Sequence, residues 1–173
     1  RGSNLAVSST DTSIARLTLP DASLLSTAIA ADGDTATEVI SSIALDKSDA
    51  KNVYAAWHDG SLGAIWTATS NDRGKTFSAK TRVSALNTGI NQNVSITTDF
   101  SGNTYLIWQS QQSGSDWDLY FARRLVGTST FETGEIQLDA ILGADTEQVE
   151  PCIDADADGK VSIAWVNRGN GKD

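Results

Sequence analysis

The stretch Ser70-Asn71-Asp72-Arg73-Gly74-Lys75-Thr76-Phe77 decides how this chain folds, and it follows the strand-like run 64–69. Gly74 can adopt a positive φ without the steric penalty of a Cβ atom. The side chains of Ser70 and Asp72 can bond to free backbone N–H groups in a turn. The stretch therefore predicts a tight hairpin turn, after which the next strand begins.

Three other segments share one pattern, which is a strand, a polar turn and a second strand that ends in tryptophan. They cover residues 43–57, 96–108 and 153–165. Apolar residues alternate along the second strands, as expected for half-buried β-structure. The tryptophans recur about every fifty residues, a period typical of four-stranded repeat units. We expect the three tryptophans in the core and an aspartate in the same place before each turn: Trp57, Trp108 and Trp165; Asp46, Asp99 and Asp156.

The pattern Ser-x-Asp-x-Gly-x-Thr-aromatic resembles the Asp-box (BNR) motif of sialidase-like β-propellers. Its structural residues here are Ser70, Asp72, Gly74, Thr76 and Phe77. The resemblance implies an all-β propeller of four-stranded antiparallel blades over residues 4–173, preceded by a tripeptide, 1–3, that looks like an expression-tag remnant. Residues 127–131 stand where a second box is expected, without its serine and aspartate.

The register of the repeats predicts about three blades. Two complete units are expected over residues 37–85 and 93–139, and residues 148–165 supply the inner half of a third. Residues 5–13 and 14–19 are expected as third and fourth strands of a blade. The chain is thus either a piece of a longer propeller or half of a ring of about six blades, completed by self-association or by a second chain.

The same resemblance places a possible binding face opposite the Asp-box. Trp117 beside Asp116 suits stacking on a sugar, although it also fits the start of a strand. His58 has no neighbouring nucleophile or second metal ligand and also suits an ordinary turn. The candidate ligand-binding residues, all expected in or beside loops on that face, are His58, Asp59, Asn91, Gln92, Gln109, Asp116, Trp117 and Arg168.

A sialidase requires an arginine triad, a tyrosine nucleophile with a glutamate, and an aspartate acid/base. Only Arg168 clearly falls in a loop on the predicted face, and all three tyrosines lie in strand patterns. No catalytic residue is therefore assigned. The sequence favours a non-catalytic binding or scaffold module with a carbohydrate or protein ligand. Part of a sialidase-like glycoside hydrolase is the alternative, and a purely structural repeat unit is a third interpretation.

Residues 154–159 read Asp-Ala-Asp-Ala-Asp-Gly, which is the first half of a calcium-binding loop. An EF-hand would need a glutamate at the twelfth position, where Trp165 stands. The sequence therefore favours a simple Asp-Gly hairpin, and a structural calcium at Asp154, Asp156 and Asp158 is the alternative. No other cofactor is expected.

Composition indicates a soluble domain. The net charge of −9 argues against a nucleic-acid partner, which would need clustered Lys and Arg. The sequence has no apolar run long enough to span a bilayer. Cys152, the single cysteine, is expected to be a buried, inert thiol. An extracellular or cell-surface location is expected from the acidic surface and the family resemblance.

Overall fold

The computed structural model describes residues 13–18, 23–28, 38–60, 63–84, 89–111, 116–132, 136–138 and 147–168, and all regular structure in these ranges is β-strand. The all-β class expected from the sequence is confirmed there. Residues 1–3 and most of the predicted strand 5–13 lie outside the described residues.

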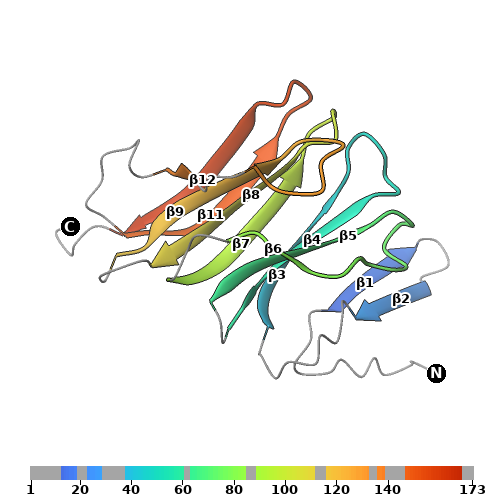
Figure 1. Ribbon diagram of the computed structural model, residues 1–173, viewed down its shortest axis with the longest axis horizontal. Coiled ribbons are helices and arrows are strands. Elements are labelled where there is room, and N and C mark those ends of the chain that lie inside the picture. The colour runs from blue at the N-terminus through green and yellow to red at the C-terminus, as the bar shows by residue number, and fades with distance from the viewer. Residues whose placement is uncertain are drawn as a thin grey trace.

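Two antiparallel sheets of four strands and two of two strands make up the described fold (Figure 1). Strand order follows chain order within each four-stranded sheet, because each strand is joined to the next by a hairpin. The first consists of β3 (Glu38–Leu45), β4 (Val53–Asp59), β5 (Ala64–Ser70) and β6 (Thr81–Arg82). The second consists of β7 (Ile90–Thr98), β8 (Thr104–Gln111), β9 (Asp118–Arg124) and β10 (Ile136–Gln137). The two-stranded sheets are β1 (Ser13–Thr18) with β2 (Ser23–Ala28), and β11 (Glu147–Ala155) with β12 (Val161–Arg168).

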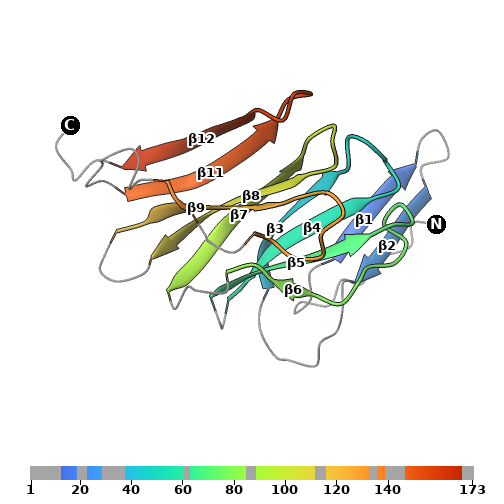
Figure 2. The same ribbon diagram turned by 45° about the horizontal axis from the view of Figure 1, so that its top comes forward.

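The first strands of three successive sheets, β3, β7 and β11, lie side by side (Figures 1 and 2). Side chains bridge them. The Thr98 hydroxyl donates to the Leu45 carbonyl over 2.8 Å, and the Thr97 hydroxyl donates to Asp154 over 3.1 Å. The sheets therefore pack face to face, and each interface between them is filled by apolar side chains.

Two apolar clusters fill these interfaces. The cluster between the four-stranded sheets includes Ile65, Leu106 and Trp108, none of which is exposed. The cluster beneath β11 includes Ile107 and Ile153. Burial of such side chains stabilises the fold by about 1.5–3 kcal/mol each.

The core prediction holds for two of the three tryptophans. Trp57 and Trp108 are fully buried, whereas Trp165 is 38% exposed. A third strand covers Trp57 and Trp108, whose register partners are Trp66 and Tyr120. In the described part of the chain, β12 pairs with β11 alone, so the prediction for Trp165 was wrong.

Cys152 is exposed, contrary to the expectation of a buried thiol. Alternation along β11 explains the error, because Pro151, Ile153 and Ala155 point into the core and Cys152 and Asp154 point out. The sequence pattern was read one residue out of register around Pro151.

The aspartate before each β-hairpin turn caps that turn, as its repeated position predicted. The Asp46 carboxylate accepts hydrogen bonds from Ser48 N at 2.8 Å and Tyr54 OH at 3.2 Å. Asp99 accepts from Ser101 N at 2.9 Å, Asn103 Nδ2 at 2.8 Å and Tyr105 OH at 2.8 Å. Asp156 accepts from the backbone N–H groups of Asp158 and Lys160, each at 2.9 Å.

The turn predicted from residues 70–77 is confirmed. Gly74 has φ +79°, and its N–H donates to Ser70 Oγ over 2.8 Å. The Asp72 carboxylate accepts from Thr76 N at 2.9 Å and from the Thr76 hydroxyl at 2.7 Å. Phe77 packs against the buried cluster that contains Trp57. The turn is therefore held by its own side chains, by a hydrogen bond of 2.8 Å from Arg73 N to the Lys51 carbonyl, and by the packing of one ring.

The Asp72 carboxylate should make the protein sensitive to acid. Hydrogen bonds from Thr76, then from Ser70 and Lys75, lower the pKa of Asp72 far below its ordinary value. A carboxyl whose pKa is lower when folded stabilises the fold fully above its unfolded pKa of about 3.9 and loses this effect as the pH falls. We expect the melting temperatures of the wild type and Asp72→Ala to differ most at neutral pH and to converge below about pH 4. An equal difference at pH 7 and pH 3 would contradict this assignment.

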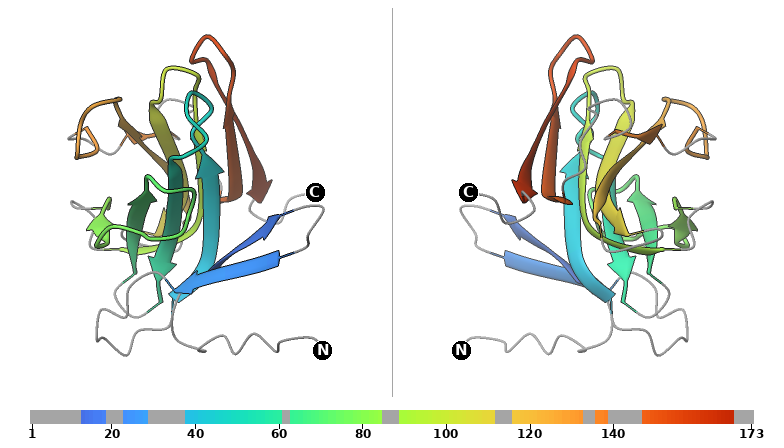
Figure 3. Two further views of the ribbon diagram at one scale, coloured as in Figure 1. Left: turned by 90° about the vertical axis from the view of Figure 1, so that its right-hand side faces the viewer. Right: turned by 90° about the vertical axis from the view of Figure 1, so that its left-hand side faces the viewer.

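The strand predicted over residues 14–19 exists as β1, with a different partner from the one expected. It pairs antiparallel with β2, and Arg16 lies opposite Leu25. The sequence analysis did not predict β2, although Pro20 and Asp21 between the two strands are favoured turn residues. This hairpin lies to one side of the other sheets (Figure 3).

Candidate functional site

Six of the eight predicted ligand-binding residues lie within strands, including Arg168 at the end of β12. His58 and Asp59 end β4, Asn91 and Gln92 belong to β7, and Gln109 lies in β8. Four of the six are buried, Gln92 is partly buried and Arg168 is exposed. These residues lie near the ends of strands and not in the loops themselves, because the strands extend beyond their apolar pattern.

Asn91 is a structural centre at this end of the sheets. It is fully buried, and its Oδ1 accepts a hydrogen bond of 3.0 Å from Trp108 Nε1. Its Nδ2 donates to the carbonyl oxygens of Gly63 and, at 3.1 Å, of Gly89. The Asn91 amide thus joins the first sheet to the second, and both of its N–H donors are used within the protein.

Gln109 bridges two bulged strands. Its Oε1 accepts from Asn93 Nδ2 at 2.7 Å and from Glu150 N at 2.8 Å. Both Asn93 and Glu150 have positive φ, +55° and +57°, and lie where the register shifts on β7 and β11. Strand bulges often re-aim side chains near functional sites. The sequence placed residues 87–93 and 144–150 on the predicted binding face but did not single out Asn93 or Glu150 as candidate binding residues.

His58 is neutral and isolated. Burial lowers the pKa of His58 below its ordinary value, and the opposing effect of Asp59 is smaller. Its Nδ1 has no hydrogen-bond partner. The imidazole is therefore uncharged at pH 7 and does not serve as a general acid in this arrangement.

The remaining predicted residues lie on the surface of the same end. Asp116 is exposed and Trp117 is partly buried just before β9, and the Trp117 carbonyl accepts from Gln148 N at 2.7 Å. Arg168 ends β12 and pairs with Glu150 at 3.1 Å. Glu150 thus contacts two predicted site residues, Gln109 through its backbone N–H and Arg168 through its carboxylate. Trp117 is joined to β11 by the hydrogen bond from Gln148.

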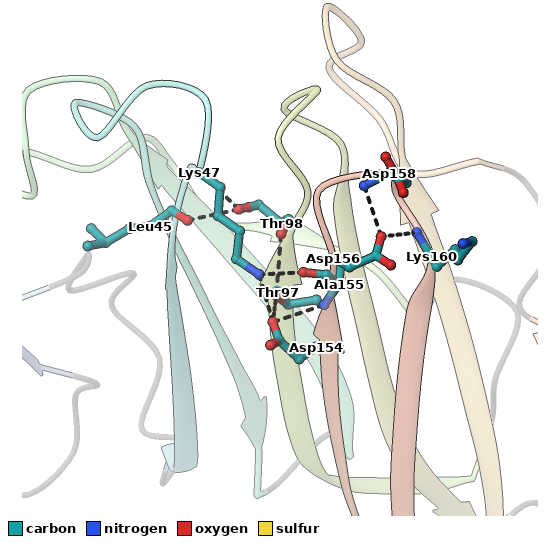
Figure 4. A network of polar contacts seen from close by, with 9 residues as sticks. All are labelled: Leu45, Lys47, Thr97, Thr98, Asp154, Ala155, Asp156, Asp158 and Lys160. Atoms are coloured by element: carbon teal, nitrogen blue, oxygen red, sulfur yellow. Dashed lines mark hydrogen bonds and ion pairs between the residues drawn. The ribbon is translucent and has the colours of Figure 1, made fainter.

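The three aspartates of the proposed calcium loop do not converge (Figure 4). Asp154 accepts hydrogen bonds from Lys47 Nζ at 2.7 Å and Thr97 Oγ1 at 3.1 Å. The hydrogen bond from Lys47 is the main reason why the pKa of Asp154 lies below its ordinary value. Asp156 faces its own turn, as described above. Among the described residues, no group of three His, Cys, Asp or Glu could hold a metal ion. A structural calcium stays a prediction.

The Lys47 side chain instead joins the first and third sheets. Its Nζ donates to Asp154 and to the Ala155 carbonyl, both at 2.7 Å, while its backbone N–H donates to Thr98 Oγ1 at 3.1 Å (Figure 4). Asp154, in the stretch that resembles a calcium-binding loop, therefore binds the ammonium group of Lys47 from the first sheet. The three alternating carboxylates were the signal in the sequence, and only Asp154 lies in β11. Nothing in the sequence indicated that Asp154 would pair with Lys47.

Solved structures show a related fold. A point mutant of NanB sialidase from Streptococcus pneumoniae aligns with a TM-score of 0.55 at 14% identity, over 94% of this chain. NanB in complex with a substituted ethanesulfonate aligns with a TM-score of 0.54 at 15% identity, over 94% of this chain. In both cases the chain spans 25% of the length of the sialidase.

This likeness supports the sialidase-like fold expected from the turn at residues 70–77. No family model and no curated protein matches the sequence. In the described ranges, no helix is long and apolar enough to cross a membrane. The comparisons define a fold, and the activity has to be argued from the residues.

Proposed function

We propose that this chain is a non-catalytic binding or scaffold module built as part of a sialidase-like β-propeller. Each four-stranded sheet corresponds to one blade in this proposal, and β11 and β12 to the inner half of a third. The ligand is a carbohydrate or a protein, and the location is extracellular or on the cell surface.

One observation carries the proposal. The buried amide side chains at the predicted binding end are hydrogen-bonded within the protein in the described part of the chain. Asn91 is bonded to Trp108 and to carbonyls, and Gln109 is bonded to Asn93 and Glu150. Amides held in this way stabilise the ends of the sheets, and an amide has no protonation equilibrium near pH 7 that could serve a general acid or base.

The tyrosines argue in the same direction. Tyr54 and Tyr105 are buried and donate their hydroxyl hydrogens to Asp46 and Asp99. Tyr120 is buried and stacks on Trp108, with ring centroids 6.2 Å apart. None of the three is placed as an exposed nucleophile.

The surface of the same end offers groups suited to binding. Trp117 is partly buried beside the exposed Asp116, and the ion pair of Arg168 and Glu150 is exposed. An aromatic ring can stack on a sugar, and carboxylate and guanidinium groups at the same end of the sheets can accept from or donate to sugar hydroxyls.

The second candidate function is part of a sialidase-like glycoside hydrolase, favoured by the likeness to NanB sialidase. Because this chain spans a quarter of that protein, residues contributed by other segments would have to complete the active site.

A binding assay and a turnover assay on the same sample separate the two functions. We expect binding on a glycan or protein panel that Trp117→Ala weakens at unchanged melting temperature, and no hydrolysis of a fluorogenic sialoside. Phe100→Ala, which removes an exposed aromatic ring in the turn between β7 and β8 at the other end of the sheets, is the matched control and should leave binding unchanged. Hydrolysis above the rate of buffer alone would overturn the non-catalytic assignment.

We also propose that the 173-residue chain self-associates. The edge strand β12 exposes Trp165 by 38% and Val166 by 44%, and an exposed apolar edge strand invites pairing. The proposed partner is a second copy that would complete a ring of about six blades. Light scattering is expected to give twice the chain mass, and the mass of one chain at micromolar concentration would contradict this.

A further inference from the structure

A cavity of about 500 Å³ lies at the end of the sheets that carries the turn 70–77. It adjoins a second cavity of about 290 Å³, and Tyr54, Thr69, Ser78 and Arg124 line both. His58 and Asp59 lie at the opposite end of β4 from Tyr54. This cavity, here named the Arg124 cavity, is therefore separate from the predicted binding end and lies between the two four-stranded sheets.

The guanidinium of Arg124 is held in place by protein groups. Its carbon lies 4.8 Å from the ring centroid of Tyr54 and 6.0 Å from that of Phe131. Its Nη2 donates to Thr104 Oγ1 over 3.1 Å. Contacts with two aromatic rings and one hydroxyl fix the orientation of a planar cation and leave its charge unneutralised.

Arg124 forms no ion pair with a carboxylate among the described residues. Arg123, its neighbour on the exposed side of β9, pairs with Glu132 through contacts of 2.8 and 3.1 Å. Arg168 likewise pairs with Glu150. In addition, Arg124 Nε is buried and has no hydrogen-bond acceptor. Asp46 lines the same cavity without pairing directly with Arg124, so an anion bound on the guanidinium would add a charge–charge contact that the described residues do not supply.

Hydroxyl and aromatic groups surround this cation. The cavities are lined by Thr69, Ser78 and Thr128, which carry hydroxyls, and by the rings of Tyr54 and Phe77. Such a lining can hydrogen-bond a polyhydroxylated molecule while a ring packs against its apolar face. A volume of about 500 Å³ falls in the usual range for small-molecule sites.

We infer that the Arg124 cavity binds a small hydroxylated carboxylate, such as a sugar acid, with its carboxylate on the Arg124 guanidinium. Arginine pairs with carboxylates through charge-assisted hydrogen bonds, for which the terminal Nη groups of Arg124 are the donors, because its Nε is buried. The inference holds whether the chain is a binding module or part of an enzyme, because it concerns the other end of the sheets.

The charge of the lining selects a carboxylate over a phosphate. Asp46 also lines the cavity. Burial acts to raise the pKa of the Asp46 carboxyl, but hydrogen bonds from Ser48, Asn52 and Asp49 outweigh it and bring the pKa below its ordinary value. Asp46 is thus an anion at pH 7, and its repulsion of a dianion is about twice that of a monoanion at the same distance.

The test uses two probes that differ in one group. Glucuronate carries a carboxylate where glucose carries a hydroxymethyl group, and both fit the cavity. We expect glucuronate, and not glucose, to shift backbone amide resonances of residues around Arg124, measured by ¹H–¹⁵N NMR titration of the 173-residue chain. Arg124→Met should weaken glucuronate binding at least tenfold. Arg123→Met, which removes a neighbouring charge outside the cavity, should leave the affinity within twofold.

Several outcomes would overturn the inference. They are equal shifts with glucose and glucuronate, equal losses in the two variants, and binding of a glutamate-rich peptide in place of glucuronate. If Arg124→Met does not fold, Arg124→Lys replaces it, because lysine keeps the charge and loses the bidentate geometry. Unchanged affinity in that folded variant would equally reject the assignment.

Discussion

Asn91→Ala is expected to destabilise the protein by about 2–4 kcal/mol. The substitution leaves the buried Nε1 of Trp108 without an acceptor and removes the bonds to the Gly63 and Gly89 carbonyls. An unsatisfied buried donor costs about 1–3 kcal/mol, and the space left by the missing amide adds to that. Urea unfolding followed by tryptophan fluorescence measures the change, since Trp108 itself reports on the site.

Gln92→Ala is the matched control for Asn91→Ala. Gln92 is the next residue of β7 and is only partly buried, so its loss should change stability by less than about 0.5 kcal/mol. If the two variants are equally stable and Asn91→Ala instead loses a ligand, the structural role given to Asn91 is wrong and the original prediction of a binding residue is restored.

The fold could be predicted from the sequence because its signals are local. The turn at residues 70–77, the aspartates before the hairpins and the spacing of Trp57 and Trp108 all act within a few residues of one another or repeat along the chain. At these positions the local conformational preference of the residues is the same as the conformation that the folded sheets require. Sequence reasoning succeeds where local preference and overall fold agree in this way.

The burial of several predicted site residues differs from the expectation for a physical reason. Polar residues at strand ends were read as loop residues, since a buried polar side chain is normally rare. His58, Asn91 and Gln109 are buried nonetheless, Asn91 and Gln109 because their partners lie in other strands. Glu150 is far from Gln109 in sequence, and no local pattern signals that pairing. Contacts between distant strands depend on the sheet arrangement, which one sequence does not specify.

The same limit applies to Arg124. In the sequence it is one of two adjacent arginines, Arg123-Arg124, in an alternating strand. Alternation places one on each face of β9, so the exposed residue meets Glu132 while Arg124 meets Tyr54 of the neighbouring sheet. The chemical difference between identical neighbours arises only when the sheets pack, and it is the origin of the cavity's unpaired charge.

Gly74→Val is expected to destabilise the protein by about 1–3 kcal/mol. The cause is the backbone, since φ is +79° and an added Cβ would meet only Val53 Cγ2, at 4.0 Å. Gly74→Asn is the matched control, because asparagine tolerates the left-handed region and should lose clearly less. Denaturant unfolding of both variants measures this, and equal losses would show that side-chain volume, and not φ, governs the turn.

Because Ser70 and Asp72 organise this turn around the N–H groups of Gly74 and Thr76, a valine that displaces Gly74 also breaks their hydrogen bonds. The loss of unfolding free energy in the double variant Gly74→Val with Asp72→Ala should therefore be smaller than the sum of the two single losses, because both substitutions act on one hydrogen-bond network.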